Sequence, residues 1–226
     1  MTSTFPGNIK YTRPNHLLCE GPSDVAFFER LMADRGLPTD PWDITSPRGK
    51  LSGVSAFTAH IQGLFTSGDI GNIERLLIVA DNDTNPSGNF TGVRRQVREG
   101  GVPVPNKPLE TARDESPTRL SVAILMLPWA GEQGCLETLL LEAAMDSNPN
   151  LNACISAFLG CCSGNDISTW SISRESKSRI HALIAAVCKE PACALQYVWA
   201  KDGNPIPIRS TRFDRIARFV ADFAAT

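Results

Sequence analysis

Several features that would assign this sequence to a specialised class of protein are missing from it. No apolar run approaches the roughly 20 residues of a membrane-spanning helix, and the longest, Val122–Pro128, has the length of a strand. The first 16 residues contain no apolar segment typical of a secretory signal peptide. Lys and Arg (22) do not outnumber Asp and Glu (24), so the net charge is −2. The sequence therefore disfavours a membrane protein, a secreted protein and a strongly basic, free-standing DNA-binding protein.

Cysteine spacing and catalytic motifs exclude further classes. The chain has seven cysteines, an odd number, and no two of them are spaced as CxxC. A disulfide framework and a structural zinc site are therefore disfavoured, and we expect a reduced, cytoplasmic protein. The motifs GxSxG, Walker A and HExxH are also missing, which argues against the hydrolases, ATPases and zinc proteases that depend on them.

The composition and the apolar pattern are those of a globular α/β protein. With 226 residues, 42% of them hydrophobic and 20% charged, the chain can bury a full core. Short apolar runs predict four strands, at 16–20, 42–46, 75–80 and 121–127, each followed by residues with helical periodicity. Because the clearest runs are continuously apolar and do not alternate, they predict a four-stranded, mainly parallel sheet flanked by helices on both faces.

The predicted organisation has three parts. Residues 1–14 form an N-terminal arm, residues 15–145 form the α/β core, and residues 146–226 form a helical C-terminal extension packed on the core. The stretch 100–119, rich in proline and polar residues, is interpreted either as a short hairpin or as a mobile loop. Ligands of parallel α/β sheets bind beyond the carboxyl ends of the strands, so the functional site is expected at that end of the core.

Acidic side chains follow three of the four predicted strands. Glu20 ends the first strand, Asp81 and Asp83 follow the third, and Glu137 comes shortly after the fourth. Since the carboxyl ends of parallel strands share one edge of the sheet, we expect these groups to lie close together. Clustered carboxylates repel one another unless a cation neutralises them, and oxygen ligands suit hard cations. The sequence therefore predicts a site for one or two Mg²⁺ or Mn²⁺ ions.

Each of these signals also has a simpler interpretation. Glu-Gly is common at the end of a strand, and Asp-x-Asp is compatible with a solvated turn in which an aspartate caps the next helix. Lys50, after the second predicted strand, could stabilise the charge of a phosphoryl-transfer transition state or simply face solvent. The same two interpretations apply to two arginine-rich helical faces, Arg94, Arg95 and Arg98 in the core and Arg209, Arg212, Arg215 and Arg218 in the extension.

Two segments of the core carry a family resemblance. CEGPSDVAFFERLM and LLIVADNDTNP together resemble the signature of the Toprim domain, in which a Glu-Gly after the first strand and a later Asp-x-Asp form one acidic metal site. A third segment, LPWAGEQGCLETLLLEA, is similar to a family of small bacterial Toprim-related (DUF3226-like, OLD-nuclease-like) proteins. The resemblance implies a Toprim-like, Rossmann-like sandwich for the core.

The resemblance also implies roles for individual residues. Glu20 would act as general acid/base or as a metal ligand, and Asp81 and Asp83 would be metal ligands. Asp24 matches the second acid of the OLD-like pattern, and Glu137 would be an outer acid that helps to hold a second metal. With Lys50 as a further catalytic candidate, the expected activity is that of a Mg²⁺- or Mn²⁺-dependent nuclease that acts on DNA or RNA.

Partners and alternatives remain open at this stage. OLD-like nucleases carry an ATPase domain that this chain lacks, so the resemblance implies a separate ATPase partner in phage defence. Asn85 stands where topoisomerases and primases carry a third aspartate, which favours a catalytically weak or inactive scaffold or regulatory subunit. A nucleotide-sugar transferase that holds Mn²⁺ through Asp-x-Asp is disfavoured by the Glu20–Asp24 segment. The sequence leaves open whether the protein is a homo-oligomer.

Overall fold

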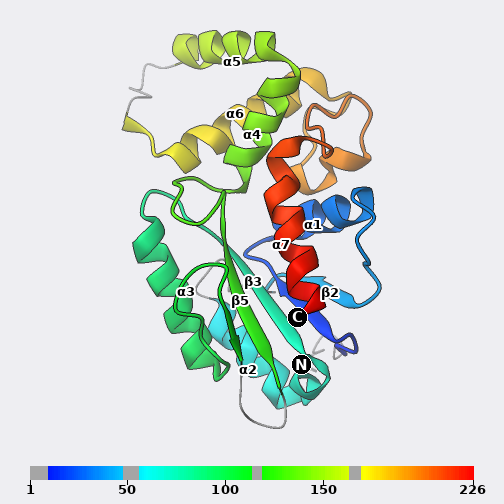
Figure 1. Cartoon of the computed structure of the whole chain (residues 1–226). Helices are drawn as coiled ribbons and strands as arrows, with labels where there is room; N and C mark the ends of the chain where they lie inside the picture. The colour runs from blue at the N-terminus through cyan, green and yellow to red at the C-terminus, as the bar shows by residue number, and fades with distance from the viewer. Residues whose placement is uncertain (1–9, 48–55, 114–118, 163–168) are drawn as a thin grey trace, which may run out of the picture.

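The computed structural model describes residues 10–47, 56–113, 119–162 and 169–226 (Figure 1). The strands are β1 (Asn15–Leu18), β2 (Trp42–Thr45), β3 (Arg75–Asp81), β4 (Thr111–Arg113) and β5 (Ser121–Leu127). The helices are α1 (Pro22–Asp34), α2 (Phe57–Ser67), α3 (Pro86–Gly100), α4 (Leu136–Ser147), α5 (Pro149–Cys162), α6 (Ile172–Val187) and α7 (Asp214–Ala225), with 3-10 turns η2 (Asp69–Asn72), η4 (Leu195–Ala200) and η5 (Thr211–Phe213). Within these described ranges, no helix is both long enough and apolar enough to cross a membrane.

The strands form one mainly parallel sheet in the order β2-β1-β3-β5-β4. The four predicted strands pair in parallel, which confirms the α/β fold class. The sheet has one strand more than predicted, because the short β4 pairs antiparallel with the edge of β5. This fifth strand lies in the stretch 100–119, and its three residues, Thr-Ala-Arg, of which the arginine is exposed, give no apolar run that would predict a strand.

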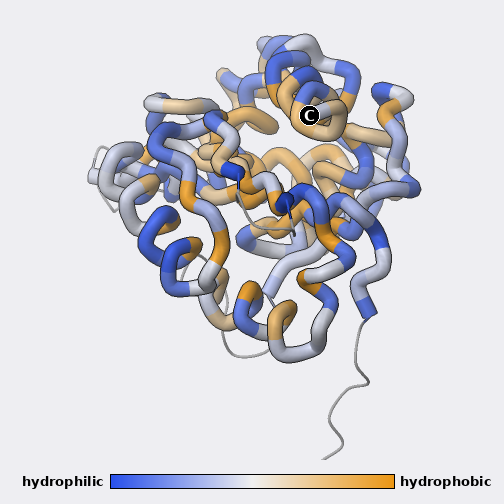
Figure 2. Tube along the Cα trace, turned by 60° about the horizontal axis from the view of Figure 1, so that its bottom comes forward, coloured by the Kyte–Doolittle hydropathy of each residue, from blue (hydrophilic) through white to orange (hydrophobic). Residues whose placement is uncertain are grey.

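Helices cover both faces of the sheet, because alternate side chains of a strand point to opposite faces. On one face Leu76 and Ile78 belong to an apolar cluster with α2 and α3. On the other face Leu77 and Val79 belong to a larger cluster with α1, α4, α6 and α7. Figure 2 shows the hydrophobic stretches concentrated in the interior and the hydrophilic ones at the outside. Helices α4, α5 and α6 extend beyond the carboxyl ends of the strands (Figure 1).

The order of the strands creates a switch point between β1 and β3. From β1 the chain passes through α1 to the edge strand β2, whereas from β3 it passes through α3 to β5 on the other side. Helices α1 and α3 belong to the apolar clusters of opposite faces, so the chain leaves these two neighbouring strands in opposite directions. Ligands of open α/β sheets bind beyond the carboxyl ends of strands at such a point.

The last elements of the chain are tied to the core by apolar contacts and ion pairs. The ring of Phe213 packs edge-on against Phe27 of α1, with 5.2 Å between the ring centroids. Three arginines of the predicted basic stripe in the extension form ion pairs with the core: Arg209 with Asp34, Arg212 with Glu142, and Arg215 with Glu132. These arginines therefore hold the extension to the core.

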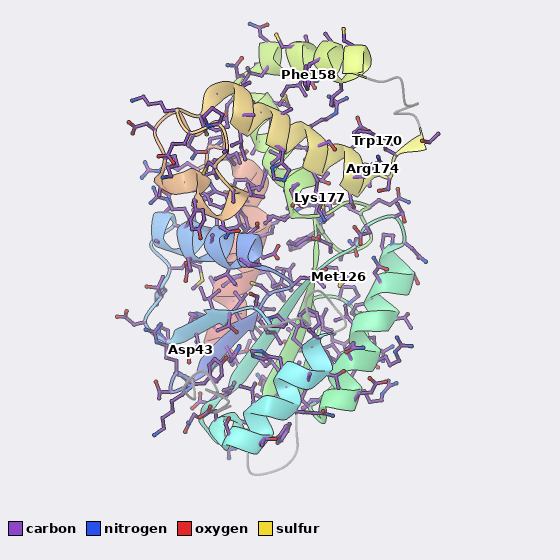
Figure 3. All side chains as sticks on the ribbon, turned by 180° about the vertical axis from the view of Figure 1, so that it is seen from behind. Asp43, Met126, Phe158, Trp170, Arg174 and Lys177 are labelled. Carbon is purple, nitrogen blue, oxygen red and sulfur yellow. The ribbon has the colours of Figure 1, made fainter. Side chains whose placement is uncertain are left out.

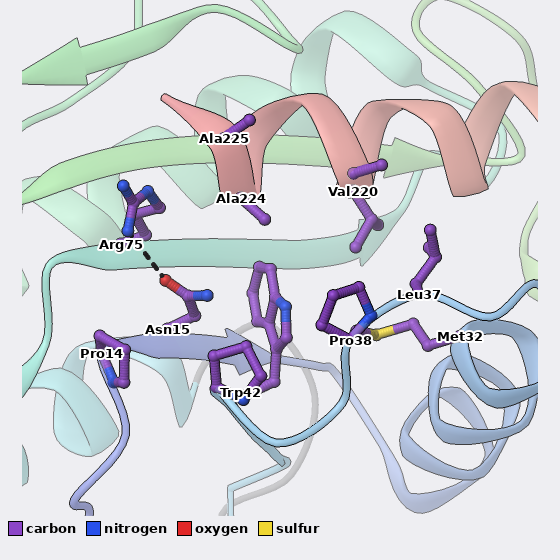
Figure 4. A pocket seen from close by; sticks show the side chains of 12 residues that line it. Pro14, Asn15, Met32, Leu37, Pro38, Trp42, Arg75, Val220, Ala224 and Ala225 are labelled. Carbon is purple, nitrogen blue, oxygen red and sulfur yellow. Dashed lines mark hydrogen bonds between the residues drawn. The ribbon is translucent and has the colours of Figure 1, made fainter.

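A pocket of about 370 Å³ lies at the opposite end of the sheet, where β1, β2 and β3 begin. Figure 4 shows Trp42 on its floor, Val220 and Ala224 of α7 on one side, and Arg75 at one end. The Arg75 guanidinium donates a hydrogen bond to the Asn15 side chain (3.2 Å). This pocket is mainly apolar and is separate from the acidic residues, which follow the other ends of the strands.

Candidate metal centre

Asp81 is the last residue of β3 and lies at the switch point. Its Oδ1 accepts a hydrogen bond from the backbone N–H of Leu136 at the start of α4 (3.0 Å). Its Oδ2 lies 4.0 Å from Nζ of Lys177 on α6, and the Asp81 side chain is 14% exposed. Asp81 thus joins β3 to two helices, and Oδ2 is the oxygen that remains for a ligand.

Glu20 and Asp24 approach Asp81 from the junction of β1 and α1. Glu20 accepts a hydrogen bond through Oε2 from the backbone N–H of Asp81 (3.3 Å). Asp24 is 9% exposed, and its Oδ2 accepts a hydrogen bond from the backbone N–H of Gly21 (2.8 Å). Gly21 has an extended backbone and precedes Pro22 at the first position of α1, so Asp24 at the third position caps the helix. This local structure fixes both acids at the end of β1.

The other side of the centre is formed by the first turn of α4 and the residue before it. Asp81, Cys135 and Glu137 each offer one possible ligand atom, and these three atoms all lie within 4.8 Å of one another. Cys135 is fully buried, whereas Glu137 is partly exposed. The three side chains therefore form a compact group of possible metal ligands that is accessible from the side of Glu137.

Asn82 fixes the loop that leads into α4. Its buried side-chain amide donates hydrogen bonds to the backbone carbonyls of Trp129 (2.7 Å) and Glu132 (2.6 Å). Next to it, the backbones of Asp83 and Gly134 exchange two hydrogen bonds of 2.7 and 2.8 Å. Asp83 has a φ of 47°, in the left-handed region that non-glycine residues seldom adopt. The backbone therefore holds the end of β3 against the loop before α4 and brings their acids together.

The remaining predicted residues lie at the margin of the centre or outside the described part of the chain. Asp83 is not in the compact group, although its charge acts on Glu20, and its Oδ2 lies 3.5 Å from Nδ2 of Asn89. Asn85 caps α3, because its Oδ1 accepts the backbone N–H of Gly88 (3.0 Å), so this oxygen is already engaged. Lys50 lies outside the described residues.

Burial and mutual repulsion make the ionised form of this centre unfavourable. Burial is the main cause that raises the pKa of Asp24 to about 7, and the charges of Glu20 and Glu137 add to it. Burial also raises the pKa of Asp81 and of Glu20, again with repulsion from neighbouring carboxylates. Burial opposes the charge of Lys177, but Glu137 and Asp81 outweigh it and raise its pKa. One ammonium group faces several carboxylates, so a divalent cation would relieve the remaining repulsion.

Sequence analysis does not predict two residues of this centre, Lys177 and Cys135. Lys177 comes from α6 in the extension; Figure 3 shows it beyond the end of β5, which Met126 marks. No local motif surrounds Lys177, so only the folded chain reveals it. Cys135 lies two residues before Glu137 in a segment that resembles the Toprim-related proteins, which is a signal that could have found it. Burial, with the charges of Glu137 and Asp81, raises the pKa of its thiol to about 12.

Two of the three possible donors in the compact group are carboxylates, which suit a hard divalent cation, and the third is a sulfur. The carboxylates of Asp81 and Glu137 are oxygen donors of the kind that Mg²⁺ and Mn²⁺ accept. Glu20 and Asp24 lie outside this compact group and act on Asp81 through their charges. The sulfur of Cys135 would add affinity for a softer cation such as Zn²⁺.

The fold and this centre define the class: an α/β protein with a possible acidic metal-binding centre at the switch point of a parallel sheet. The chain belongs to the DUF3226 family, whose model, described as "Protein of unknown function (DUF3226)", matches residues 14–201. This match confirms the predicted DUF3226-like membership, and it includes both the sheet and Lys177 of α6. No curated protein and no solved structure shows a significant match to the chain.

Proposed function

We propose that this protein is a divalent-metal-dependent nuclease of the Toprim, OLD-like kind, which hydrolyses phosphodiester bonds of DNA or RNA. One observation carries the proposal: four carboxylates and one ammonium group converge at the switch point of the sheet, namely Glu20, Asp24, Asp81, Glu137 and Lys177. Buried charges of one sign destabilise a fold, and clusters with strongly raised pKa values are frequent at functional sites.

The proposed ligands of Mg²⁺ or Mn²⁺ are Asp81 and Glu137, whose oxygens lie within 4.8 Å of each other. A divalent ion supplies charge that stabilises the transition state and lowers the pKa of a bound water. Glu20 is suited to general acid/base catalysis, because burial raises the pKa of its carboxyl towards the pH of the reaction. Asp24, beside Glu20, would support a second ion.

Lys177 is the cation that we propose to contact the reacting phosphate. Its side chain is 47% exposed, so its ammonium group can meet a phosphate that approaches Asp81 from solvent. Burial lowers the pKa of Lys177, but the charges of Glu137 and Asp81 outweigh this effect and raise it, so the ammonium group keeps its charge beside the carboxylates. Such a cation stabilises the charge that develops on a phosphoryl group in the transition state. The role predicted for Lys50 is not tested by this geometry.

A second candidate function is a catalytically inactive scaffold or regulatory subunit. It is favoured by the hydrogen bonds that Asp81 and Asp24 accept from the backbone at the starts of α4 and α1 (3.0 and 2.8 Å), because these bonds give both side chains a helix-capping role that needs no metal. The helix-capping role of Asn85 also favours it. A separate ATPase partner, derived from the OLD resemblance, is compatible with both functions and remains part of the proposal.

The experiment that separates these functions is cleavage of plasmid, single-stranded DNA and RNA with Mg²⁺, with Mn²⁺ and with a chelator. Asp81→Asn removes the charge but keeps an oxygen for the Leu136 N–H. Asp202→Asn is the matched control, because the Asp202 side chain is 79% exposed. We expect metal-dependent cutting by the wild type and the control, and none by Asp81→Asn. Undiminished cutting by Asp81→Asn would contradict the proposed site. If the wild type binds no metal, the nuclease proposal is wrong and the scaffold or regulatory function is the remaining candidate.

A further inference from the structure

The start of α6 and the residue two positions before it carry two cationic side chains and one aromatic side chain near the acidic centre. Trp170 lies two residues before the helix and contacts Arg174, and Arg174 and Lys177 are three residues apart within α6, which places these two on the same side of the helix. Figure 3 shows the three in this order, with Lys177 nearest to the end of the sheet. Extending the proposed nuclease function, on which this inference rests, we propose that these three residues form a binding track for single-stranded nucleic acid.

Trp170 and Arg174 form an ordered stacking surface. The Arg174 guanidinium carbon lies 4.2 Å from the centroid of the Trp170 ring, a close cation–π contact that restricts both side chains. Arg174 is exposed, Trp170 is partly exposed, and no carboxylate of the described residues lies within ion-pair distance of Arg174. The pair therefore offers a partly exposed aromatic ring and a positive charge that has no ion-pair partner among the described residues.

A second tryptophan–arginine pair in the same chain provides a comparison. Arg215 lies 4.9 Å from the centroid of the Trp129 ring, but it also donates two hydrogen bonds to the carboxylate of Glu132 (2.6 and 2.7 Å). Its charge is neutralised within the protein, so this pair has a structural role. The contrast identifies the Trp170–Arg174 pair as the one that is available to an anionic ligand.

The chemistry of the track favours an unpaired strand. A base can stack on Trp170 only if it is not already stacked and paired within a duplex, and base–aromatic stacking is the usual mode of single-strand binding. Arg174 and Lys177 are separated by about 4.5 Å along the helix axis, so consecutive groups of one sugar–phosphate backbone can contact both. A strand bound in this way passes Lys177 and presents a phosphate to Asp81, 4.0 Å away from that ammonium group.

The test is a binding measurement without metal, in which only the track is probed. Fluorescence anisotropy in a chelator compares short single-stranded DNA and RNA with a duplex of the same sequence. We expect single strands to bind more tightly than the duplex, and Trp170→Ala to weaken their binding about tenfold or more. Trp170→Phe keeps a stacking ring and should remain close to the wild type.

Two further variants identify the charge contribution. Arg174→Ala should reduce the slope of log K against log salt concentration by about 0.7, the value for one lost phosphate contact on a single strand. Arg30→Ala is the matched control, because it removes an exposed arginine from α1, and it should leave single-strand binding unchanged. A Trp170→Ala protein that binds single strands like the wild type, or a wild type that prefers duplex or binds neither, would overturn the track.

Failure of the track and failure of the proposed function give different results. Because the binding assay contains no metal, unchanged binding by Trp170→Ala contradicts the track even if the protein cleaves nucleic acid with Mn²⁺. Conversely, a wild type that binds single strands through Trp170 but never binds Mn²⁺ contradicts the proposed function alone. Thermal unfolding of each Trp170 variant shows whether lost binding results from unfolding of the protein. If Trp170→Ala is unstable, the comparison of Trp170→Phe with the wild type still tests the stacking role.

Discussion

Asp24→Asn removes one negative charge from the acidic centre and retains a side-chain oxygen that can accept the Gly21 N–H (2.8 Å). Burial, together with repulsion from Glu20 and Glu137, raises the pKa of Asp24 from 3.8 to about 7. An acid whose pKa is higher in the folded than in the unfolded protein lowers stability as pH rises between the two values. Asp24→Asn should therefore stabilise the metal-free protein at neutral and basic pH.

The size of this effect follows from the pKa of Asp24. A rise from 3.8 to about 7 corresponds to about 4 kcal/mol once the carboxyl is fully ionised, and relaxation of the surrounding groups reduces it. We expect Asp24→Asn to increase the free energy of unfolding by about 2 kcal/mol near pH 8, and hardly at all near pH 4, where the carboxyl is mostly protonated in the folded protein. Mn²⁺ should then stabilise the wild type more than the variant, since the ion neutralises the charge that the variant lacks.

Urea unfolding in a chelator, followed by circular dichroism at several pH values between about 4 and 8, measures this difference. Asp202→Asn serves as control, because its exposed carboxylate should contribute little at any pH. A variant that is no more stable than the wild type near pH 8 would refute the reasoning. A stability difference that does not change with pH would refute it as well, because then the lost charge is not the cause.

Three further predictions concern neighbouring residues. Lys177→Gln removes the cation 4.0 Å from Asp81, so we expect at least a hundredfold lower kcat. Because a positive charge beside the metal ligands is lost, Mn²⁺ should bind more tightly by calorimetry. Weaker Mn²⁺ binding would contradict the placement of Lys177 beside the metal site. Asn82→Ala removes the donor to the carbonyls of Trp129 and Glu132 and should lower stability by about 2 kcal/mol, which an unchanged thermal unfolding curve would disprove. Cys135→Ser should weaken Zn²⁺ binding more than Mg²⁺ binding, because sulfur prefers soft cations; equal effects on both would show that its sulfur is not a ligand.

The parts of the site that follow β1 and β3 are predictable because they depend on local pattern. The runs before Glu20 and Asp81 are continuously apolar, which indicates parallel strands, and parallel strands bring their carboxyl ends to one edge. The structure gathers Glu20, Asp24, Asp81 and Glu137 there, and leaves Asp83 at the margin because its backbone bridges to Gly134. Whether these residues bind a metal stays a prediction.

Other features depend on tertiary contacts that no local pattern reveals. Lys177 reaches the centre because α6 folds back over the end of the sheet, and nothing in the sequence near Lys177 indicates that path. The sequence reveals the spacing of the arginine stripe in the extension but not its ion pairs, because the acidic partners lie far away in the chain, as with Arg209 and Asp34. The edge strand β4 has only three residues, which is too short for an alternation of apolar and polar residues to be recognised.

The most direct test of the central claim, that the acidic centre binds a divalent cation, is an anomalous difference map from crystals soaked in Mn²⁺. We predict one strong peak about 2.0–2.2 Å from carboxylate oxygens of both Asp81 and Glu137, absent from crystals of Asp81→Asn. A map with no peak in the centre, or with its strongest peak away from Asp81, would contradict the claim.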